Sequence, residues 1–254
     1  MPRVVRFSIA PVRSLGLQHP AKIELTETGV VEDRRFFLRD ESNRLVDQLV
    51  VGSLVRIRSE TDADGRRLRL EFPDGTIVED DVVLGEAVET PIYGRTGVGR
   101  VVDGPWAAAL STYCGRHVEV IRCDRPGGTR RGNPTSLVTD GTLRELAEHA
   151  GVATVDGRRF RMLIELEDGA PREEDTWIGH RIAIGDAVLE VTKPVARCAI
   201  TTHDPDTGER DLDTLRTIIG YHGLRDGKHV DLGVLADVVE PGRVRLGDAV
   251  TRLD

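Results

Sequence analysis

The stretch DGRRLRLEFPDG, residues 64–75, contains one strand pattern between two turn signals. Leu68, Leu70 and Phe72 alternate with polar residues, so they share one face of a predicted β-strand. An Asp-Gly pair stands at each end, and Asp-Gly suits the positive φ angles of hairpin turns. Short strand patterns of this kind run from Arg3 to about Val102. Their spacing is typical of an antiparallel meander or barrel.

Helical patterns interrupt the strands at residues 105–113, 140–150 and 212–221. Each has an ordinary start signal, which is Pro105 for the first, Thr139 or Asp140 for the second and Asp211 for the third. Amphipathic spacing predicts that each helix packs one face on a β core. In the third helix this inward face is expected to hold Leu215, Ile218 and Ile219.

A phrase of the form apolar-Gly-acid-Ala-Val occurs at residues 84–88, 184–188 and 246–250. Its irregular spacing excludes a solenoid, and each copy predicts a tight turn that leads into a strand. The Gly-, Pro- and Arg-rich stretch 122–133 predicts a mobile loop. It is the best candidate for a linker or a lid between a β-rich N-terminal domain and a mixed C-terminal one.

The charge balance argues against nucleic acid as a partner. Thirty-five Lys and Arg residues stand against 43 Asp and Glu residues, which gives a net charge of −8. The field of the whole molecule therefore does not attract phosphate backbones. Arginine greatly outnumbers lysine, which occurs only at positions 22, 193 and 228. Two explanations of this excess are open. One is a general bias of the sequence toward arginine. The other is that some of the arginines form a local anion site, because guanidinium binds anionic oxygens well.

The N-terminal residues MPRVVRFSIAPVRS carry Arg6 and Arg13 between short apolar runs. They form neither a signal-peptide core nor the roughly 20 apolar residues of a membrane span. A cytoplasmic protein without membrane contact is therefore expected. Cys114, Cys123 and Cys198 form no C-x-x-C pair and are too few for a disulfide framework, so three reduced thiols are expected.

Standard strings for serine hydrolases, zinc proteases and nucleotide binding are absent. The densest run of reactive residue types is KPVARCAITTHDPDTG, residues 193–208. Pro194 is expected to end the preceding strand and leave Cys198 just beyond it. Arg197 would favour the thiolate form that nucleophiles and metal ligands need, and an inert core thiol is the alternative. His203 and the acidic residues after it form a turn pattern rather than a recognisable metal site.

The pattern P-x-x-R-C-x-x-T-T-x-D-P-x-T-G, from Pro194 to Gly208, resembles the C-terminal motif of the molybdenum cofactor sulfurase C-terminal (MOSC) domain family. That family includes the mitochondrial amidoxime reducing components and their bacterial relatives. Further matches fall in the family's order along nearly the whole chain: Pro11-Val12-Arg13-Ser14, Asp33-Arg34-Arg35-Phe36, residues 106–115, residues 134–146, Phe160-Arg161, Trp177-x-Gly179 and the segment from Val244 to Asp248.

The resemblance implies an α+β, predominantly β fold with two domains. Residues 1–100 would form a β-barrel domain of the MOSC N-terminal type, and residues 101–121 would be a connecting helix and strand. Residues 122–254 would form the MOSC domain, which is mixed, β-barrel-like and has a few peripheral helices. A cofactor is expected between the domains, where ligand sites are common.

In the molybdenum-binding members of the family, the cysteine of Arg-Cys gives a thiolate to molybdenum held by a pterin cofactor. The resemblance therefore implies that Cys198 is the metal ligand and catalytic residue. The phosphate of the pterin needs cationic and hydroxyl partners, and the matching positions here are Arg13, Ser14, Arg34 and Arg161. Arg197 either reaches the same anion or pairs with a carboxylate. Cys114 and Cys123 match no ligand motif and are expected to be structural or incidental.

The chain departs from the family pattern at Leu163, Ala196 and Arg13, where asparagine, serine and lysine respectively are frequent. Leu163 removes a polar side chain expected near the cofactor. These changes bear on cofactor affinity and substrate choice, and they leave Cys198 in place.

The implied function is a molybdenum-dependent oxidoreductase that removes oxygen from small N-hydroxylated or N-oxide substrates. Three dispersed cysteines cannot supply the C-x4-C-x2-C pattern of a plant-type ferredoxin. Electrons would therefore come from a separate flavin or iron–sulfur protein. One alternative is a carrier of the molybdenum cofactor, or of sulfur on Cys198, without its own turnover. Another is an interaction or small-ligand protein that has lost the cofactor.

Overall fold

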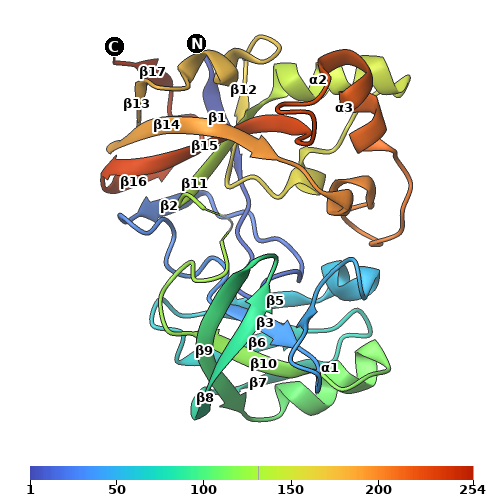
Figure 1. Ribbon diagram of the computed structural model, residues 1–254. Coiled ribbons are helices and arrows are strands. Elements are labelled where there is room, and N and C mark those ends of the chain that lie inside the picture. The colour runs from blue at the N-terminus through green and yellow to red at the C-terminus, as the bar shows by residue number, and fades with distance from the viewer. Residues whose placement is uncertain (131, 254) are drawn as a thin grey trace.

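The computed structural model describes residues 1–130 and 132–253. Arg131, within the predicted loop 122–133, and Asp254 lie outside the described residues. The chain forms two β-rich halves, one above the other, with both chain ends in the upper half (Figure 1). Among the described residues, none of the helices is long and apolar enough to cross a membrane.

The upper half is built on a seven-stranded sheet that nearly closes into a barrel. Its strand order is β1 (Arg3–Phe7), β12 (Ile164–Glu167), β11 (Thr135–Thr139), β15 (Asp231–Glu240), β14 (Ala187–Ala196), β13 (Arg181–Ile184) and β17 (Val250–Arg252). The two edges meet because the Val4 N–H donates to the Asp248 carbonyl at 3.0 Å and the Gly247 N–H donates to the Val4 carbonyl at 2.8 Å. Closure of this kind removes exposed strand edges.

Two helices cover one side of this barrel, α2 (Asp140–Ala150) and α3 (Thr214–His222) (Figure 1). The side chain of Thr139 caps α2, which confirms the predicted bounds and start signal. The cap of α3 is Asp213 rather than Asp211, because the Asp213 carboxylate accepts from the Arg216 N–H. Ile218 is fully buried as predicted, whereas Ile219 is 41% exposed, so the predicted inward face was wrong at that residue.

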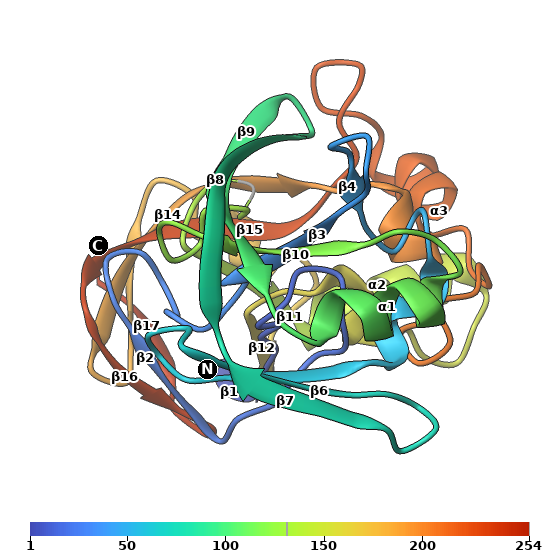
Figure 2. The same cartoon turned by 90° about the horizontal axis from the view of Figure 1, so that it is seen from below.

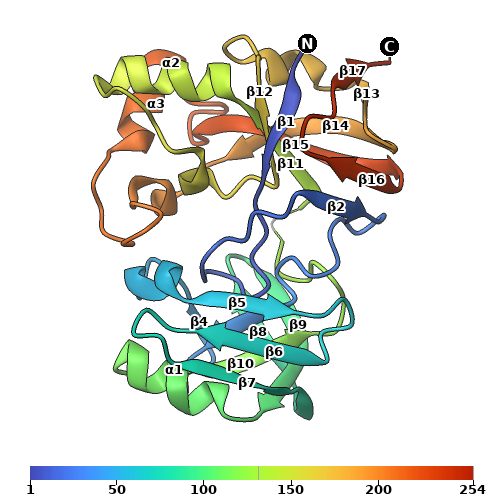
Figure 3. The same cartoon turned by 180° about the vertical axis from the view of Figure 1, so that it is seen from behind.

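The lower half contains two facing sheets. The five-stranded sheet has the order β4 (Leu45–Val46), β3 (Phe36–Arg39), β10 (Glu119–Cys123), β9 (Arg95–Asp103) and β8 (Val83–Ile92). The three-stranded sheet is β5 (Arg58–Thr61), β6 (Arg67–Glu71) and β7 (Ile77–Asp81), and it forms the near face of the lower half in Figure 3. Helix α1 (Trp106–Cys114) lies across the outer end of this half (Figure 2).

One apolar core joins the two lower sheets and α1. It includes Phe36 and Leu38 from β3, Leu68 and Leu70 from β6, and Trp106 from α1, all fully buried. The predicted strand at residues 67–72 is thus confirmed, with its alternating apolar residues facing inward. Its flanking turns are confirmed as well, since Gly65 and Gly75 have φ angles of 66° and 86°.

The architecture is predominantly β with a few peripheral helices, as predicted. The two halves, however, do not each consist of the residues on one side of the predicted boundaries at residues 100 and 122. Strand β1 pairs with β12, and β2 (Lys22–Leu25) pairs with β16 (Gly242–Arg245), so both join the upper half. Strand β10 lies inside the lower sheet between β3 and β9. The reason is that strands pair with whichever partner offers a free edge, regardless of distance along the chain.

The three Gly-acid phrases do not share one structure. Gly185 and Gly247 have φ angles of 56° and 85° and form the predicted tight turns before β14 and β17. The copy at residues 84–88 instead lies inside β8, where the pairing register with β9 shifts between Leu84 and Ala87. The prediction was wrong there, because a bulge within a continuing hairpin uses the same small and polar residues as a turn.

Glu174 is a buried carboxyl group that should make stability depend on pH. It lies in the 3₁₀ turn Glu173–Trp177, and one of its oxygens accepts from the Thr139 and Thr142 hydroxyls at 2.7 and 2.9 Å. Burial outweighs these hydrogen bonds and raises the pKa of Glu174 to about 7. A raised pKa means that the folded state favours the neutral form. Folding stability is therefore lost as the pH rises from the ordinary pKa of glutamate to about 7.

We expect Glu174→Gln to stabilise the protein at pH 8 by about 2–3 kcal/mol and to have little effect at pH 4.5, because the amide stays neutral. Thermal unfolding of both proteins at the two pH values measures this difference. Glu167→Gln, at an exposed position, is the matched control and should show no such pH dependence. An equal effect of Glu174→Gln at both pH values would contradict the raised pKa.

Candidate functional site

A cavity of about 410 Å³ collects residues from both halves of the molecule. Its lining comes from the segments around residues 13, 34, 48, 134, 161, 195 and 229. All six residues singled out from the sequence line this one cavity: Arg13, Ser14, Arg34, Arg161, Arg197 and Cys198. The structure thus brings together side chains that are up to 185 positions apart in the chain, from 13 to 198.

Three of these six residues have left-handed backbone conformations. The φ angles are 74° at Ser14, 54° at Arg34 and 51° at Arg161. Residues without glycine's freedom rarely adopt such angles, and they cluster at functional sites when the surroundings hold them there. Two backbone hydrogen bonds join the segments that carry Arg13 and Arg34. The Arg34 N–H donates to the Ala10 carbonyl at 2.7 Å, and the Arg13 N–H donates to the Phe36 carbonyl at 2.8 Å. These bonds lay the two arginine-bearing loops side by side.

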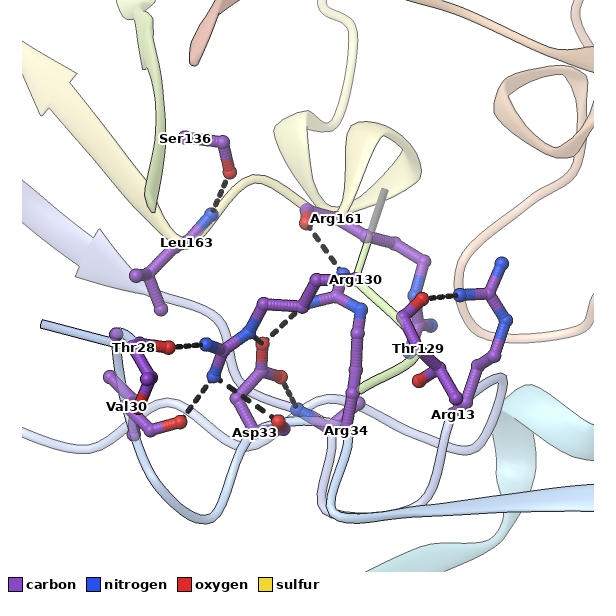
Figure 4. Close-up of polar contacts among 12 residues, drawn as sticks. Arg13, Thr28, Val30, Asp33, Arg34, Thr129, Arg130, Ser136, Arg161 and Leu163 are labelled. Atoms are coloured by element: carbon purple, nitrogen blue, oxygen red, sulfur yellow. Dashed lines mark hydrogen bonds and ion pairs between the residues drawn. The ribbon is translucent and has the colours of Figure 1, made fainter. Parts of the chain in front are cut away.

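Asp33 anchors the charged groups of this site, as Figure 4 shows. Its carboxylate is 1% exposed and accepts from the Ala10 N–H at 2.8 Å, from the Arg130 Nε at 3.2 Å and from Arg34. Burial alone would raise the pKa of Asp33, but the charges of Arg34 and Arg130 together with the Ala10 bond hold it below its usual value. Arg130 also donates to the Thr28 and Val30 carbonyls. The carboxylate is thus ionised, and it ties the segment before β11 to the loop before β3.

Arg161 is enclosed beside Arg34 and Arg13, and the Asp33 carboxylate offsets only part of their positive charge. It ends the 3₁₀ turn Gly157–Phe160, and its guanidinium donates to the Leu15 carbonyl at 2.8 Å. Burial and the neighbouring positive charges of Arg34 and Arg13 lower its pKa to about 9. Arg34 donates in turn to the Arg161 carbonyl at 3.4 Å (Figure 4). Three like charges gathered in this way favour an anion among them.

Arg13 has one hydrogen-bonded nitrogen and one buried nitrogen that could still donate. One terminal nitrogen donates to the Thr129 carbonyl at 2.6 Å, while the buried Nε has no partner among residues 1–130 and 132–253. Burial and the charge of Arg34 also lower the pKa of Arg13. A buried donor without an acceptor is costly, and a bound anion would remove that cost.

The charge of the cavity is opposite to that of the whole protein. Its described lining includes one carboxylate, Asp33, and eight cationic side chains: Arg13, Arg34, Arg130, Arg159, Arg161, Lys193, Arg197 and Arg225. Arg159 and Arg225 have carboxylate partners outside the lining, Asp211 and Asp231. The surplus is still strongly positive in a chain of net charge −8. Part of the arginine excess in the sequence is therefore gathered around one cavity.

Cys198 is the exposed thiol of this protein, whereas Cys123 is buried and Cys114 is half-buried. Burial raises the pKa of the Cys123 thiol to about 12, which makes it inert, in agreement with the structural role expected for it. Strand β14 does not stop at Pro194 as predicted but continues to Ala196, with register shifts on both sides of the proline. Bulges let the strand tolerate a residue without an N–H. Cys198 follows two residues after the strand, at the start of the 3₁₀ turn Ala199–Thr202.

Arg197 packs against the wall of the cavity that is formed by Phe160 and Met162. It stacks over the Phe160 ring at 5.2 Å, donates to the Phe160 carbonyl and approaches the Met162 sulfur at 3.2 Å. Its main-chain N–H donates to the Val230 carbonyl at 2.7 Å. These contacts fix the backbone beside Cys198, so Arg197 positions the thiol while lining the cavity.

The segment after Cys198 is a turn held by ion pairs. The Asp204 carboxylate accepts from the Asp206 and Thr207 N–H groups at 3.0 and 2.8 Å, which confirms the predicted turn. Arg158 binds Asp206 through two hydrogen bonds of 2.7 and 2.8 Å. No group of three His, Cys, Asp or Glu side chains suited to a metal occurs in the described part of the chain.

Several lining residues were not predicted from the sequence. Arg130 carried no signal, since its role depends on a buried partner 97 positions away. Lys193 stands at the start of the reactive run, and His229 lies on a turn that hydrogen-bonds with Arg225. Only the alignment of strands β14 and β15 brings these last two residues to the cavity of Cys198.

Leu163 shows how the chain accommodates its departure from the family pattern. Its side chain is 2% exposed and belongs to the core of the upper barrel. Its N–H is paired with the Ser136 hydroxyl at 2.9 Å, and both residues line the cavity (Figure 4). Ser136 thus supplies a polar group at the place where the Leu163 side chain offers none.

Comparison with known proteins finds a domain family and several relatives. The model of the MOSC domain matches residues 124–251. The chain is 29% identical to a molybdenum cofactor sulfurase of Anopheles gambiae, over 91% of this chain and 34% of that protein. It is 30% identical to mouse mitochondrial amidoxime-reducing component 1, over 46% of this chain and 36% of that protein. The chain thus spans about a third of the length of these relatives.

Among solved structures, the YUAD protein from Bacillus subtilis aligns over 98% of this chain and 94% of its own, with 13% identity and a TM-score of 0.48. The domain model covers half of the sequence, and within that half lie Arg161 and the full pattern from Pro194 to Gly208. The chain belongs to the MOSC domain family.

Proposed function

We propose that this protein binds a molybdenum–pterin cofactor in the cavity between its halves and reduces small N-hydroxylated or N-oxide substrates there. The observation that carries the proposal is the convergence of one exposed thiol with eight cationic side chains and a single carboxylate in one cavity of an otherwise acidic protein. A thiolate is a soft ligand suited to a redox metal, and guanidinium suits a phosphate. The orphaned Nε of Arg13 is the kind of donor such a phosphate would satisfy.

The proposed roles combine the family motif with the place of each side chain in the cavity. Cys198 would hold the metal, while Arg13, Ser14, Arg34 and Arg161 would hold the anionic end of the pterin. When bound, the group supplies a two-electron redox centre at which a substrate N–O bond is cleaved. Arg197 would keep the Cys198 backbone in place through Phe160. The substrate oxygen leaves as water, with two protons from solvent and two electrons from a separate flavin or iron–sulfur donor.

Metal analysis after expression in a molybdenum-sufficient host tests the proposal. We expect stoichiometric molybdenum in the wild type and in Cys114→Ala, and loss of most of it in Cys198→Ala, because the substitution removes the thiolate ligand. Cys114→Ala is the matched control, since Cys114 lies at the end of α1 away from the cavity. Absence of molybdenum from the wild type, or its full retention in Cys198→Ala, would refute the proposed site.

A second candidate function is a carrier of the cofactor or of sulfur on Cys198. It is favoured by the sulfurase relative, whose similarity extends over 91% of this chain. Turnover separates the two functions. Molybdenum-loaded protein supplied with a reduced dye should consume benzamidoxime or hydroxylamine if it is a reductase, and failure with a whole panel of N-oxygenated compounds would favour the carrier.

A further inference from the structure

The tip of the β8–β9 hairpin contains an aromatic residue in an unfavourable conformation. Ile92 pairs with Arg95, so Tyr93 and Gly94 form a two-residue turn, with φ angles of 48° and 79°. Positive φ at both positions defines a turn in which Asn-Gly is the preferred sequence. A bulky aromatic side chain is uncommon at such an angle, and strain of this kind is retained where it serves a function. The hairpin tip rises toward the upper half of the molecule (Figure 1).

Tyr93 is held in one orientation although it is 52% exposed. Its hydroxyl donates to the carboxylate of Asp47, a residue that is 2% exposed, and the Arg13 guanidinium lies 5.8 Å from the centre of its ring. Arg95, the next residue after the turn, donates to the Arg130 carbonyl. The ring is therefore fixed at the edge of the cavity that Arg13 lines.

Tyr93 and Cys198 belong to opposite halves of the molecule. The Tyr93 ring lies against Arg13, and Arg13 and Cys198 both line the cavity. A ligand that reaches Cys198 past Arg13 therefore passes close to the Tyr93 ring. Gln48, next to Asp47, lines the cavity together with Cys198.

Asp47 also holds the backbone of the turn that follows it. The Leu49 N–H donates to the Asp47 carboxylate at 3.0 Å, and the Val50 N–H donates to the Asp47 carbonyl at 3.0 Å. The carboxylate that binds the Tyr93 hydroxyl is thus itself fixed in place, and Leu49 and Val50 on this turn are 43% and 48% exposed.

We infer that Tyr93, oriented by Asp47, is a specificity-determining residue that binds the flat apolar part of a compound whose reactive end is at Cys198. The ligand class is an aromatic compound with a small polar head, because a fixed aromatic ring favours stacked or edge-on contact with another ring. For catalysis, the inference rests on the proposed function. It then predicts that the protein prefers aromatic N-oxygenated substrates to small aliphatic ones.

The test uses cofactor-free full-length protein with Cys114→Ala in all samples, so that labelling reports on Cys198. The rates of thiol modification by N-phenylmaleimide and by N-methylmaleimide give a phenyl preference that does not depend on enzymatic activity. We expect Tyr93→Asn to lower this preference about fivefold, which is about 1 kcal/mol. Tyr93→Phe keeps the ring but loses the hydrogen bond to Asp47, so it should lower the preference less. Asparagine suits the turn better than tyrosine, which offsets the loss of the hydrogen bond to the buried Asp47.

Ile77→Asn is the matched control, since Ile77 is 53% exposed on β7 and does not line the cavity. On loaded protein, Tyr93→Asn should raise the KM for benzamidoxime and leave that for hydroxylamine unchanged. An unchanged phenyl preference in Tyr93→Asn overturns the inference. If Tyr93→Asn lowers the phenyl preference but the loaded protein turns over no substrate, the binding role of Tyr93 is supported and the proposed reductase function is refuted.

Discussion

Replacement of Asp33 by asparagine should destabilise the protein by about 3–5 kcal/mol at pH 7, because it removes one partner of a buried ion pair and leaves the others uncompensated. Two guanidinium groups, those of Arg34 and Arg130, share this carboxylate, and the second is 7% exposed. In a chain of this size the loss corresponds to a fall in Tm of roughly 10 °C. Thermal or denaturant unfolding measures it directly.

The pH dependence of this effect follows from the lowered pKa of Asp33. A carboxyl group with a lowered pKa contributes stability above its ordinary pKa, and that stability is lost as the pH falls through the lowered value. The difference between the wild type and Asp33→Asn should therefore be full at pH 7 and shrink below about pH 4.

Asp64→Asn is a suitable control for Asp33→Asn. It breaks an Asp–Arg pair of 3.4 Å in which both side chains are about two-thirds exposed or more, and such surface pairs contribute about 1 kcal/mol or less. A cost for Asp33→Asn as small as that of the control would contradict the anchoring role of Asp33. A large cost that stays constant down to pH 3 would contradict its ionised state.

Replacement of Arg161 by methionine should have opposite effects on stability and on ligand binding. In the free protein, Arg161 is enclosed beside Arg34 and Arg13, and its lowered pKa reports the cost of that charge. Methionine fills a similar length without the charge. We expect the free protein to gain about 1–2 kcal/mol, or a rise in Tm of roughly 3–6 °C. Substitutions at binding sites often stabilise a protein at the expense of its function, because binding groups are not optimised for stability.

The same variant should lose its response to anions. Pyrophosphate titrated into the wild type should raise the Tm, because a ligand that binds only the folded state stabilises it. Arg161→Met should show a much smaller rise and should retain little molybdenum after expression in a molybdenum-sufficient host. Arg56→Met, at an exposed position outside the cavity, is the control. A destabilised Arg161→Met that still responds to pyrophosphate would show that Arg161 serves the fold rather than the anion.

Local patterns in the sequence were sufficient for the secondary structure wherever a short-range rule applies. The alternation of residues 67–72, the Thr139 cap and the Asp-Gly turns were all confirmed, because each depends on residues within a few positions. Errors arose where distant contacts override such rules. Pairing with β15 carries β14 through Pro194, and pairing with β9 turns the first Gly-acid phrase into a bulge.

The sequence by itself determined the β-rich class and the order of the motifs, because these are properties of composition and spacing. The six candidate residues came from the resemblance of those motifs to the MOSC family. Only the tertiary structure decided that the six line one cavity, that Asp33 and Arg130 support them, and that the Tyr93 ring lies against Arg13 at the edge of that cavity. The physical reason is that the direction of a side chain depends on which strands pair and on which buried charges meet. Those contacts join residues such as Arg34 and Arg161, 127 positions apart, and neither composition nor spacing contains them.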